Sequence, residues 1–144
     1  GGLQPELVPG EIILTDGAFN DTAVARLYGY DFEIIQSSKD LTTEIEEMIT
    51  SAEIPYKRGL HWTTDAGYRE TWGQVMDYRD KGALCVEMEG VGLFTIANYR
   101  KCVATGIYVV SDVYSENDWK LGWEGNDIKK AVGAVIAMII ESIR

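Results

Sequence analysis

Histidine, cysteine and positive charge are all scarce in this chain. Its 144 residues include one histidine and two cysteines, and 23 acidic residues against 13 basic ones give a net charge of -10. A negative chain lacks the positive field that attracts nucleic acid or anionic membranes, so neither is an expected partner. With His61 alone and no cluster of cysteine and histidine, no metal site is expected.

Long apolar runs are missing as well. No run reaches the roughly 20 residues that would span a bilayer, and no signal peptide opens the sequence, so a cytoplasmic location is expected. Cys85 and Cys102 lie within apolar runs, where a cysteine is usually a small buried residue in a reducing compartment. The residues alone leave a disulfide open, although no framework of cysteines supports one.

What is present is typical of a soluble globular protein: 46% of the residues are hydrophobic and 25% are charged. The length matches one domain, 1–144. Nearly continuous apolar stretches predict strands buried on both faces, and apolar residues at helical spacing predict helices between them. Apolar stretches predict strands at 11–15, 83–86 and 103–110, and a further strand is predicted at 56–62; the predicted helices are 41–52, 69–80, 88–99 and 128–143.

The stretch from Ala83 to Phe94 is the most informative part of the chain. It is an apolar strand that ends in Glu87 and Glu89 and then enters an apolar helix. A buried carboxylate is costly unless it is paired, hydrogen-bonded or bound to a ligand. Two interpretations follow: the glutamates bind a polyhydroxyl ligand, or they cap the helix, whose N-terminus favours acids.

Polar side chains also follow two other predicted strands. Thr63, Thr64 and Asp65 end one strand, and Ser111 with Asp112 ends another. Ligands of α/β proteins bind outside the carboxyl ends of the strands, so these groups are expected to converge there with the glutamates. For the threonines and Asp65, a local turn held by their own side chains is an equal alternative.

The sequence Val86-Glu87-Met88-Glu89, followed by Gly90 and later by Val110-Ser111-Asp112, resembles the signature of the nucleoside phosphorylase and nucleosidase family. The resemblance covers nearly the whole chain, including residues 1–4 and 62–71. It implies a three-layer αβα fold with a central, mostly parallel or mixed sheet, of which this chain forms the C-terminal part.

The resemblance also implies roles for individual residues. Glu87, Met88 and Glu89 would bind the ribose, and Asp112 would donate a proton to the base. The base pocket would include Thr64, Tyr68, Val86 and Ser111. Cleavage of an N-glycosidic bond needs a stabilised cationic sugar and a neutralised leaving base, which these groups would supply.

The resemblance favours a purine over uridine as the base, because Ser111 and Asp112 are present and no Gln-x-Arg follows Tyr68. The string from Trp62 to Thr71 nevertheless resembles the subgroup that contains uridine phosphorylases. Phosphate would be the co-substrate, no cofactor is implied, and a homo-oligomer is expected.

Family members hold phosphate with a glycine loop and arginines that precede the segment resembling residues 1–4, so an N-terminal portion is expected to be missing. Three hypotheses remain: a nucleoside phosphorylase in truncated form, which is preferred, a hydrolytic nucleosidase, or a non-catalytic nucleoside-binding module. Whether the chain is active alone stays open. The polar segment 114–126 predicts either a lid or an ordinary surface loop. Its Lys120 is the candidate basic partner of Asp112.

Overall fold

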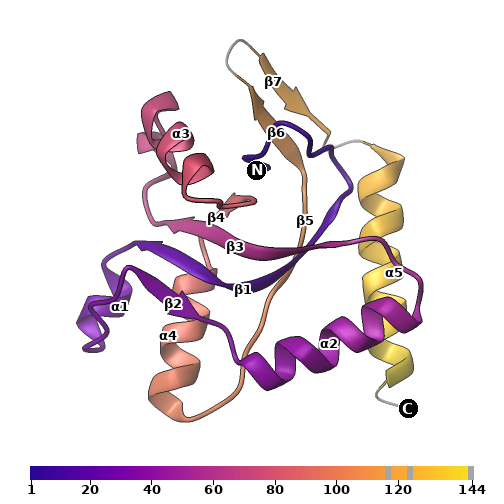
Figure 1. Cartoon of the computed structure of the whole chain (residues 1–144), viewed down its shortest axis with the longest axis horizontal. Helices are drawn as coiled ribbons and strands as arrows, with labels where there is room; N and C mark the ends of the chain where they lie inside the picture. Colours follow the sequence, from indigo (N-terminus) through magenta and orange to yellow (C-terminus); the bar gives the residue numbers. More distant parts are fainter. Residues whose placement is uncertain (116–117, 123–124, 143–144) are drawn as a thin grey trace.

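The computed structural model describes residues 1–115, 118–122 and 125–142 (Figure 1). A mixed sheet of five strands forms its centre: β1 (Ile12–Asp21), β2 (Ile34–Gln36), β3 (Lys57–Thr64), β4 (Val86–Glu87) and β5 (Ile107–Val109). β3 pairs parallel with β1, and β4 pairs parallel with β3. β2 and β5 both pair antiparallel with β1. The predicted α/β class with a mixed sheet is confirmed.

Helices connect the strands, and a hairpin precedes the last helix. The helices are α1 (Val24–Leu27), α2 (Lys39–Ser51), the 3-10 turn η1 (Gly67–Arg69), α3 (Trp72–Asp80), α4 (Gly90–Arg100) and α5 (Asn126–Ser142). The hairpin strands are β6 (Asp112–Ser115) and β7 (Asp118–Leu121). Within the described residues, none of the helices has the length and apolar character needed to cross a membrane.

Helices cover both faces of the sheet. Ala18 and Phe19 are neighbours on β1, so their side chains point to opposite faces. Ala18 packs with Ala25 of α1 and Phe94 of α4, whereas Phe19 packs with Val75 of α3. Accordingly, α3 and α4 lie on opposite sides of the strands in Figure 1, which gives the expected αβα layers.

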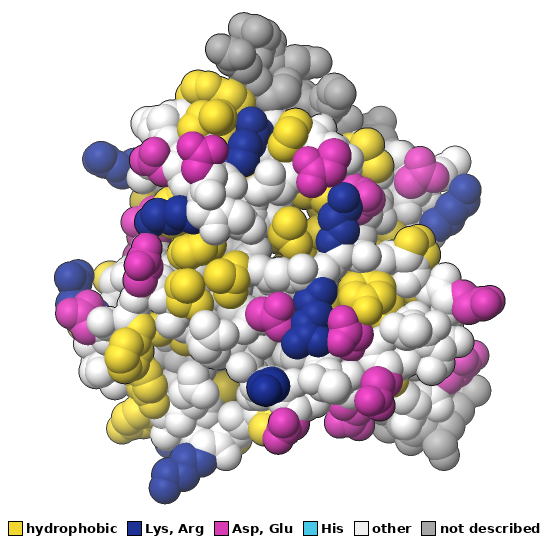
Figure 2. Space-filling model, in the orientation of Figure 1, with side chains coloured by type: hydrophobic (Ala, Val, Ile, Leu, Met, Phe, Trp, Pro, Cys, Tyr) yellow, Lys and Arg dark blue, Asp and Glu magenta, His cyan; other side chains and the backbone are white. Residues whose placement is uncertain are grey.

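The amino half of the sheet packs against α2 and α5. Leu14 of β1 forms a core cluster with Ile49 and Met138 from these helices. The predicted apolar stripe of α5 is buried only in part, because Ile136 and Ile140 are 52% and 47% exposed. Positive and negative side chains are interspersed over the face shown in Figure 2 rather than gathered in one field.

Several predicted boundaries are wrong. β1 does not end at Asp16 and Gly17 but continues to Asp21, with an irregularity in its pairing at Asp16. β3 continues through Thr64, so Thr63 and Thr64 belong to the strand rather than to a loop. The short strand β2 has no counterpart among the predicted strands. The extensions of β1 and β3 arise because strand pairing continues beyond the apolar residues of a strand.

Of the predicted loop 114–126, residues 114–115 and 118–121 belong to the paired strands β6 and β7, and Asn126 begins α5. Glu116 and Trp123, two residues expected in a lid, lie outside the described residues, as does the side chain of Lys120.

The direction of β5 corrects a further expectation. Val109 pairs with Ile12, so the carboxyl end of β5 lies at the amino end of β1 and not beside the carboxyl ends of β3 and β4. Ser111 and Asp112 therefore reach the other polar residues by a different route, through β6.

Candidate functional site

Glu87 closes the N-terminus of α4. Its Oε2 accepts hydrogen bonds from the backbone N–H groups of Glu89, at 2.9 Å, and Gly90, at 2.7 Å. The first N–H groups of a helix have no partner within the helix, and the helix dipole favours a negative charge beside them. The helix-capping interpretation of the sequence therefore holds for Glu87.

The second oxygen of Glu87 has two buried partners. Its Oε1 accepts a hydrogen bond from the Thr63 hydroxyl and lies 3.0 Å from Nε2 of His61. Burial raises the pKa of Glu87, but hydrogen bonds from His61 and Thr63 outweigh it, so the pKa falls below its usual range. Glu87 is consequently a carboxylate at neutral pH. Because a carboxylate only accepts hydrogen bonds, Nε2 of His61 carries the proton between them.

His61 is completely buried, and both of its ring nitrogens have polar neighbours. Its Nδ1 lies 2.6 Å from the hydroxyl of Thr15, and its ring packs against Phe94 and Tyr108. No histidine appears on the face shown in Figure 2. Sequence reasoning missed this residue as a functional candidate. The available signal was the only histidine of the chain, placed inside the predicted strand 56–62.

Met88 and Glu89 lie on the outer side of the same turn. Met88 is 52% exposed, and Glu89 is exposed as well. Oε2 of Glu89 accepts a hydrogen bond from the N–H of Met88 at 3.2 Å. The two glutamates of the motif thus differ: the carboxylate of Glu87 is hydrogen-bonded within the protein, and that of Glu89 faces solvent.

The predicted base loop lies beside this turn. A Cβ placed on Gly67 would be 3.8 Å from Sδ of Met88. Tyr68, the next residue, is fully exposed. Thr64 is buried, and its hydroxyl accepts a hydrogen bond from the N–H of Ala66 at 3.2 Å. The local-turn alternative is therefore observed at Thr64.

Asp112 approaches these residues through the first residues of the chain. Gly1 and Val86 exchange backbone hydrogen bonds of 2.9 and 2.8 Å, and Gly2 donates to the carbonyl of Asp112 at 2.6 Å. The N-terminus accordingly lies between β4 and β6 in Figure 1. Because adjacent strands stand about 4.8 Å apart, Asp112 lies roughly 10 Å from Val86.

Further contacts hold Asp112 and its strand in place. The Asp112 side chain is nearly buried, accepts a hydrogen bond from the Ser111 hydroxyl, and lies 3.9 Å from the N-terminal nitrogen of Gly1. On the same strand, the Tyr114 hydroxyl donates to Glu70 at 2.6 Å, which ties β6 to the loop after η1. The predicted sugar turn, base loop and Asp112 strand therefore gather in one region.

A small cavity of about 160 Å³ lies in this region. Three of the predicted residues line it, namely Val86, Glu87 and Ser111. The other five are not among the described residues that line it: Thr64, Tyr68, Met88, Glu89 and Asp112. Cys85 also lines it, but burial raises the pKa of its thiol to about 12, which makes it a poor nucleophile.

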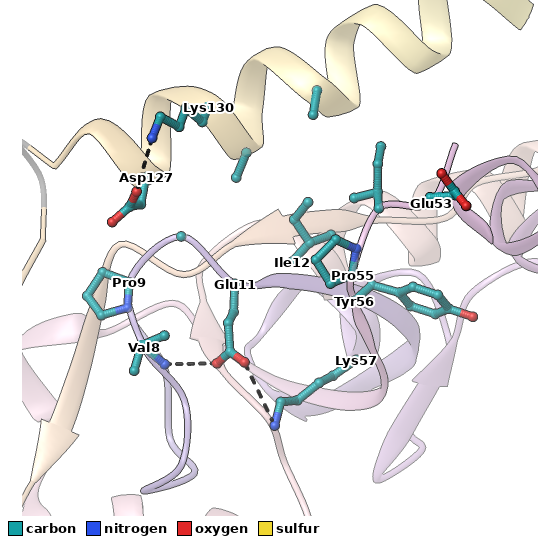
Figure 3. Close-up of a pocket in the computed structure, with 14 residues that line it drawn as sticks. Val8, Pro9, Glu11, Ile12, Glu53, Pro55, Tyr56, Lys57, Asp127 and Lys130 are labelled. Atoms are coloured by element: carbon teal, nitrogen blue, oxygen red, sulfur yellow. Dashed lines mark hydrogen bonds and ion pairs between the residues drawn. The ribbon is translucent and has the colours of Figure 1, made fainter. Parts of the chain in front are cut away.

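A larger cavity, of about 560 Å³, lies at the amino ends of β1 and β3, beside α5 (Figure 3). Four of the charged residues that line it form two ion pairs: Glu11 lies 3.9 Å from Lys57, and Asp127 lies 3.8 Å from Lys130. None of the predicted site residues lines it. In the part of the chain that the structure describes, no group of three or more His, Cys, Asp or Glu side chains is placed to hold a metal ion.

Comparison with known proteins accords with this arrangement. A family model described as the phosphorylase superfamily matches residues 1–143. The chain belongs to the phosphorylase superfamily. The predicted family is thereby confirmed.

Individual relatives of this superfamily member are distant. The chain is 30% identical over 114 residues to the DeoD-type purine nucleoside phosphorylases of Exiguobacterium sibiricum and Bacillus cytotoxicus, covering 78% of this chain and 48% of each relative. It therefore spans about half the length of the curated relatives it matches. A solved structure of the P. knowlesi homolog of P. falciparum PNP superposes with a TM-score of 0.77 at 21% identity, over 98% of this chain and 56% of that one. That likeness supports the fold.

Proposed function

We propose that this chain carries the nucleoside-binding residues of a nucleoside phosphorylase. The reaction would cleave the N-glycosidic bond of a nucleoside, a purine nucleoside rather than uridine, with phosphate to give the free base and ribose 1-phosphate. One observation carries the proposal: Glu89 presents an exposed carboxylate on a turn that Glu87 fixes from inside. Membership of the phosphorylase superfamily supports it.

The proposed ribose site is the turn itself. Glu89 accepts hydrogen bonds from sugar hydroxyls, since hydrogen bonds to a carboxylate are stronger than those between neutral groups. Met88 packs its thioether against the sugar, and Glu87 contributes by holding the turn and adding negative charge behind it. A cationic sugar in the transition state is stabilised by such fixed negative charge.

The proposed base site lies between the turn and β6. Asp112 donates a proton to the purine ring, and the hydrogen bond from Ser111 orients its carboxyl group. Val86 and Thr64 border the base. The exposed ring of Tyr68 offers a stacking surface. Inorganic phosphate is the proposed co-substrate, no cofactor is required, and the protein assembles as a homo-oligomer.

Calorimetric titration with inosine, adenosine and uridine tests the binding site. The chain should bind the purine nucleosides more tightly than uridine. Glu89→Gln should weaken inosine binding at least tenfold, since it removes the charge that accepts from the sugar hydroxyls. Glu47→Gln is the matched control, because Glu47 is an exposed acid on α2, and it should leave affinity unchanged. Equal affinity of the wild type and Glu89→Gln would remove the ribose role of Glu89.

The reaction is tested by following base release with and without phosphate. Release that requires phosphate identifies phosphorolysis, and release in its absence identifies a hydrolytic nucleosidase. Asp112→Asn should reduce purine turnover far more than purine binding; equal effects on both would exclude a proton-donating role. Nucleoside binding without base release under either condition would identify a non-catalytic binding module.

A further inference from the structure

A buried polar chain runs from the centre of the sheet to the turn that carries Glu89. We propose that His61 is a positioning residue for nucleoside binding, which acts through Glu87 to hold residues 87–90 in place. The inference rests on the proposed function for its ligand. The positioning itself can be measured without any ligand.

The orientation of the His61 ring is fixed at both nitrogens. Nδ1 lies 2.6 Å from the Thr15 hydroxyl, which in turn accepts a hydrogen bond from the N–H of Gly17 at 3.0 Å. Nε2 lies 3.0 Å from Glu87 Oε1. Because the ring is fully buried, water cannot replace either partner. The position of the imidazole therefore determines where the Glu87 carboxylate lies.

Glu87 transmits this position to the backbone of the turn. Its Oε2 accepts from the N–H groups of Glu89 and Gly90, and both are amides of the segment that presents the Glu89 side chain. Thr63 supports the arrangement, since its hydroxyl donates to Glu87 and accepts from the N–H of Val91 at 3.1 Å. A displaced Glu87 carboxylate would release the two amides, and the Glu89 side chain would lose its fixed direction.

Gly90 gives independent evidence that the imidazole and the turn are fitted to each other. A Cβ at position 90 would lie 2.5 Å from Nε2 of His61, 2.9 Å from Oη of Tyr108 and 3.0 Å from Oε1 of Glu87. No side chain can occupy that space while His61 keeps its place. Glycine at this position allows the first turn of α4 to reach the His61–Glu87 pair.

Two polar variants separate the two hydrogen bonds of His61. In His61→Gln, the side-chain amide extends far enough to donate to Glu87. In His61→Asn, the shorter amide can bond Thr15 but does not reach Glu87. Ile49→Ala is the control for general destabilisation, because Ile49 is buried in the separate cluster with Leu14 and Met138. Two quantities are measured for each: inosine affinity by calorimetry, and hydrogen exchange of the Glu89 and Gly90 amides by NMR, relative to the amide of Val75, which is hydrogen-bonded within α3 and lies outside the Ile49 cluster.

The expected result is a split between the variants. His61→Asn should expose the Glu89 and Gly90 amides to at least tenfold faster exchange and weaken inosine binding at least tenfold. His61→Gln should remain within threefold of the wild type in both measurements. Ile49→Ala should change neither the relative exchange rates nor the affinity.

Two results would overturn the proposal: unchanged exchange of the two amides in His61→Asn, or the same changes in Ile49→Ala. A wild-type chain that binds none of inosine, adenosine and uridine, yet shows the expected exchange pattern, would instead refute the proposed function and support the positioning of the turn by His61.

Discussion

The carboxyl and amino ends of the parallel strands differ in how their charged side chains are paired. At the carboxyl end of β4, beside β5, a cavity of only about 160 Å³ is lined by Glu87, a carboxylate with buried hydrogen-bond partners. At the amino ends of β1 and β3, a cavity of about 560 Å³ has charged residues that pair near the surface. Chemistry requires groups held in a fixed geometry, so the smaller cavity is the better functional candidate.

Burial explains the contrast. The Glu87 side chain is 11% exposed, whereas the Lys57 side chain at the amino end of β3 is 35% exposed. The ammonium group of Lys57 lies 3.9 Å from Glu11 and 4.0 Å from Glu6. Water and salt screen charges of the second kind, and the low dielectric strengthens interactions of the first kind. Mutations at the two ends of the strands should therefore change the free energy of unfolding by different amounts.

The largest effect is expected for Glu87→Gln. The amide of glutamine places N–H donors where His61, Thr63 and the α4 backbone already donate, so we expect a loss of about 3 kcal/mol in the free energy of unfolding at pH 7. Urea denaturation followed by circular dichroism measures it. A loss below about 0.5 kcal/mol would show that solvent screens the interactions of Glu87 as strongly as those of Lys57.

Acid should remove much of this difference. The folded-state pKa of Glu87 lies below its unfolded value of about 4.3, so its stabilisation is complete above that pH and is lost as pH falls through the folded-state pKa. The stability gap between the wild type and Glu87→Gln should shrink below about pH 4. Denaturation curves from pH 7 to pH 2.5 test this. Other carboxylates titrate in both proteins and cancel, so a constant gap would contradict the ionised state of Glu87.

Two glycine substitutions provide a matched pair. Gly90→Ala should cost about 2 kcal/mol, because the new Cβ would lie 2.5 Å from Nε2 of His61. Gly133→Ala in α5 should stabilise the protein by up to about 1 kcal/mol, since nothing lies within 4 Å of the added Cβ and alanine favours helix. The melting temperatures of the two variants, compared with that of the wild type, measure these effects. Similar effects of both would show that the fit around Gly90 is looser than its distances indicate.

The smallest effect on stability is expected at the amino ends of the strands. Lys57→Met should change the free energy of unfolding by less than about 0.5 kcal/mol, because its ion pairs are long and partly hydrated. The difference should also be insensitive to salt between 0.05 and about 0.5 M, since little electrostatic energy is present to screen. A loss of stability comparable to that of Glu87→Gln would abolish the contrast between the two ends of the strands.

Part of the fold and of the candidate site was predictable from local patterns. The apolar runs located β1 and β4 although their ends shifted, β3 was located at 56–62 without such a run, and helical spacing located α2 and α5. The acids before α4 predicted a cap, and Glu87 forms one. The direction of β5 was not predictable, because an apolar run has the same composition in a parallel and an antiparallel strand.

The sequence by itself determined the α/β class, the family motif around Glu87 and Glu89, and the two uses open to an acid at a strand end. Only the tertiary structure showed that Glu87 caps α4 and faces inward to His61, whereas Glu89 faces solvent. The physical reason is distance along the chain. Thr15, His61 and Glu87 meet because β1, β3 and β4 are neighbouring strands of one sheet, and contacts between such remote residues leave no local pattern in the sequence.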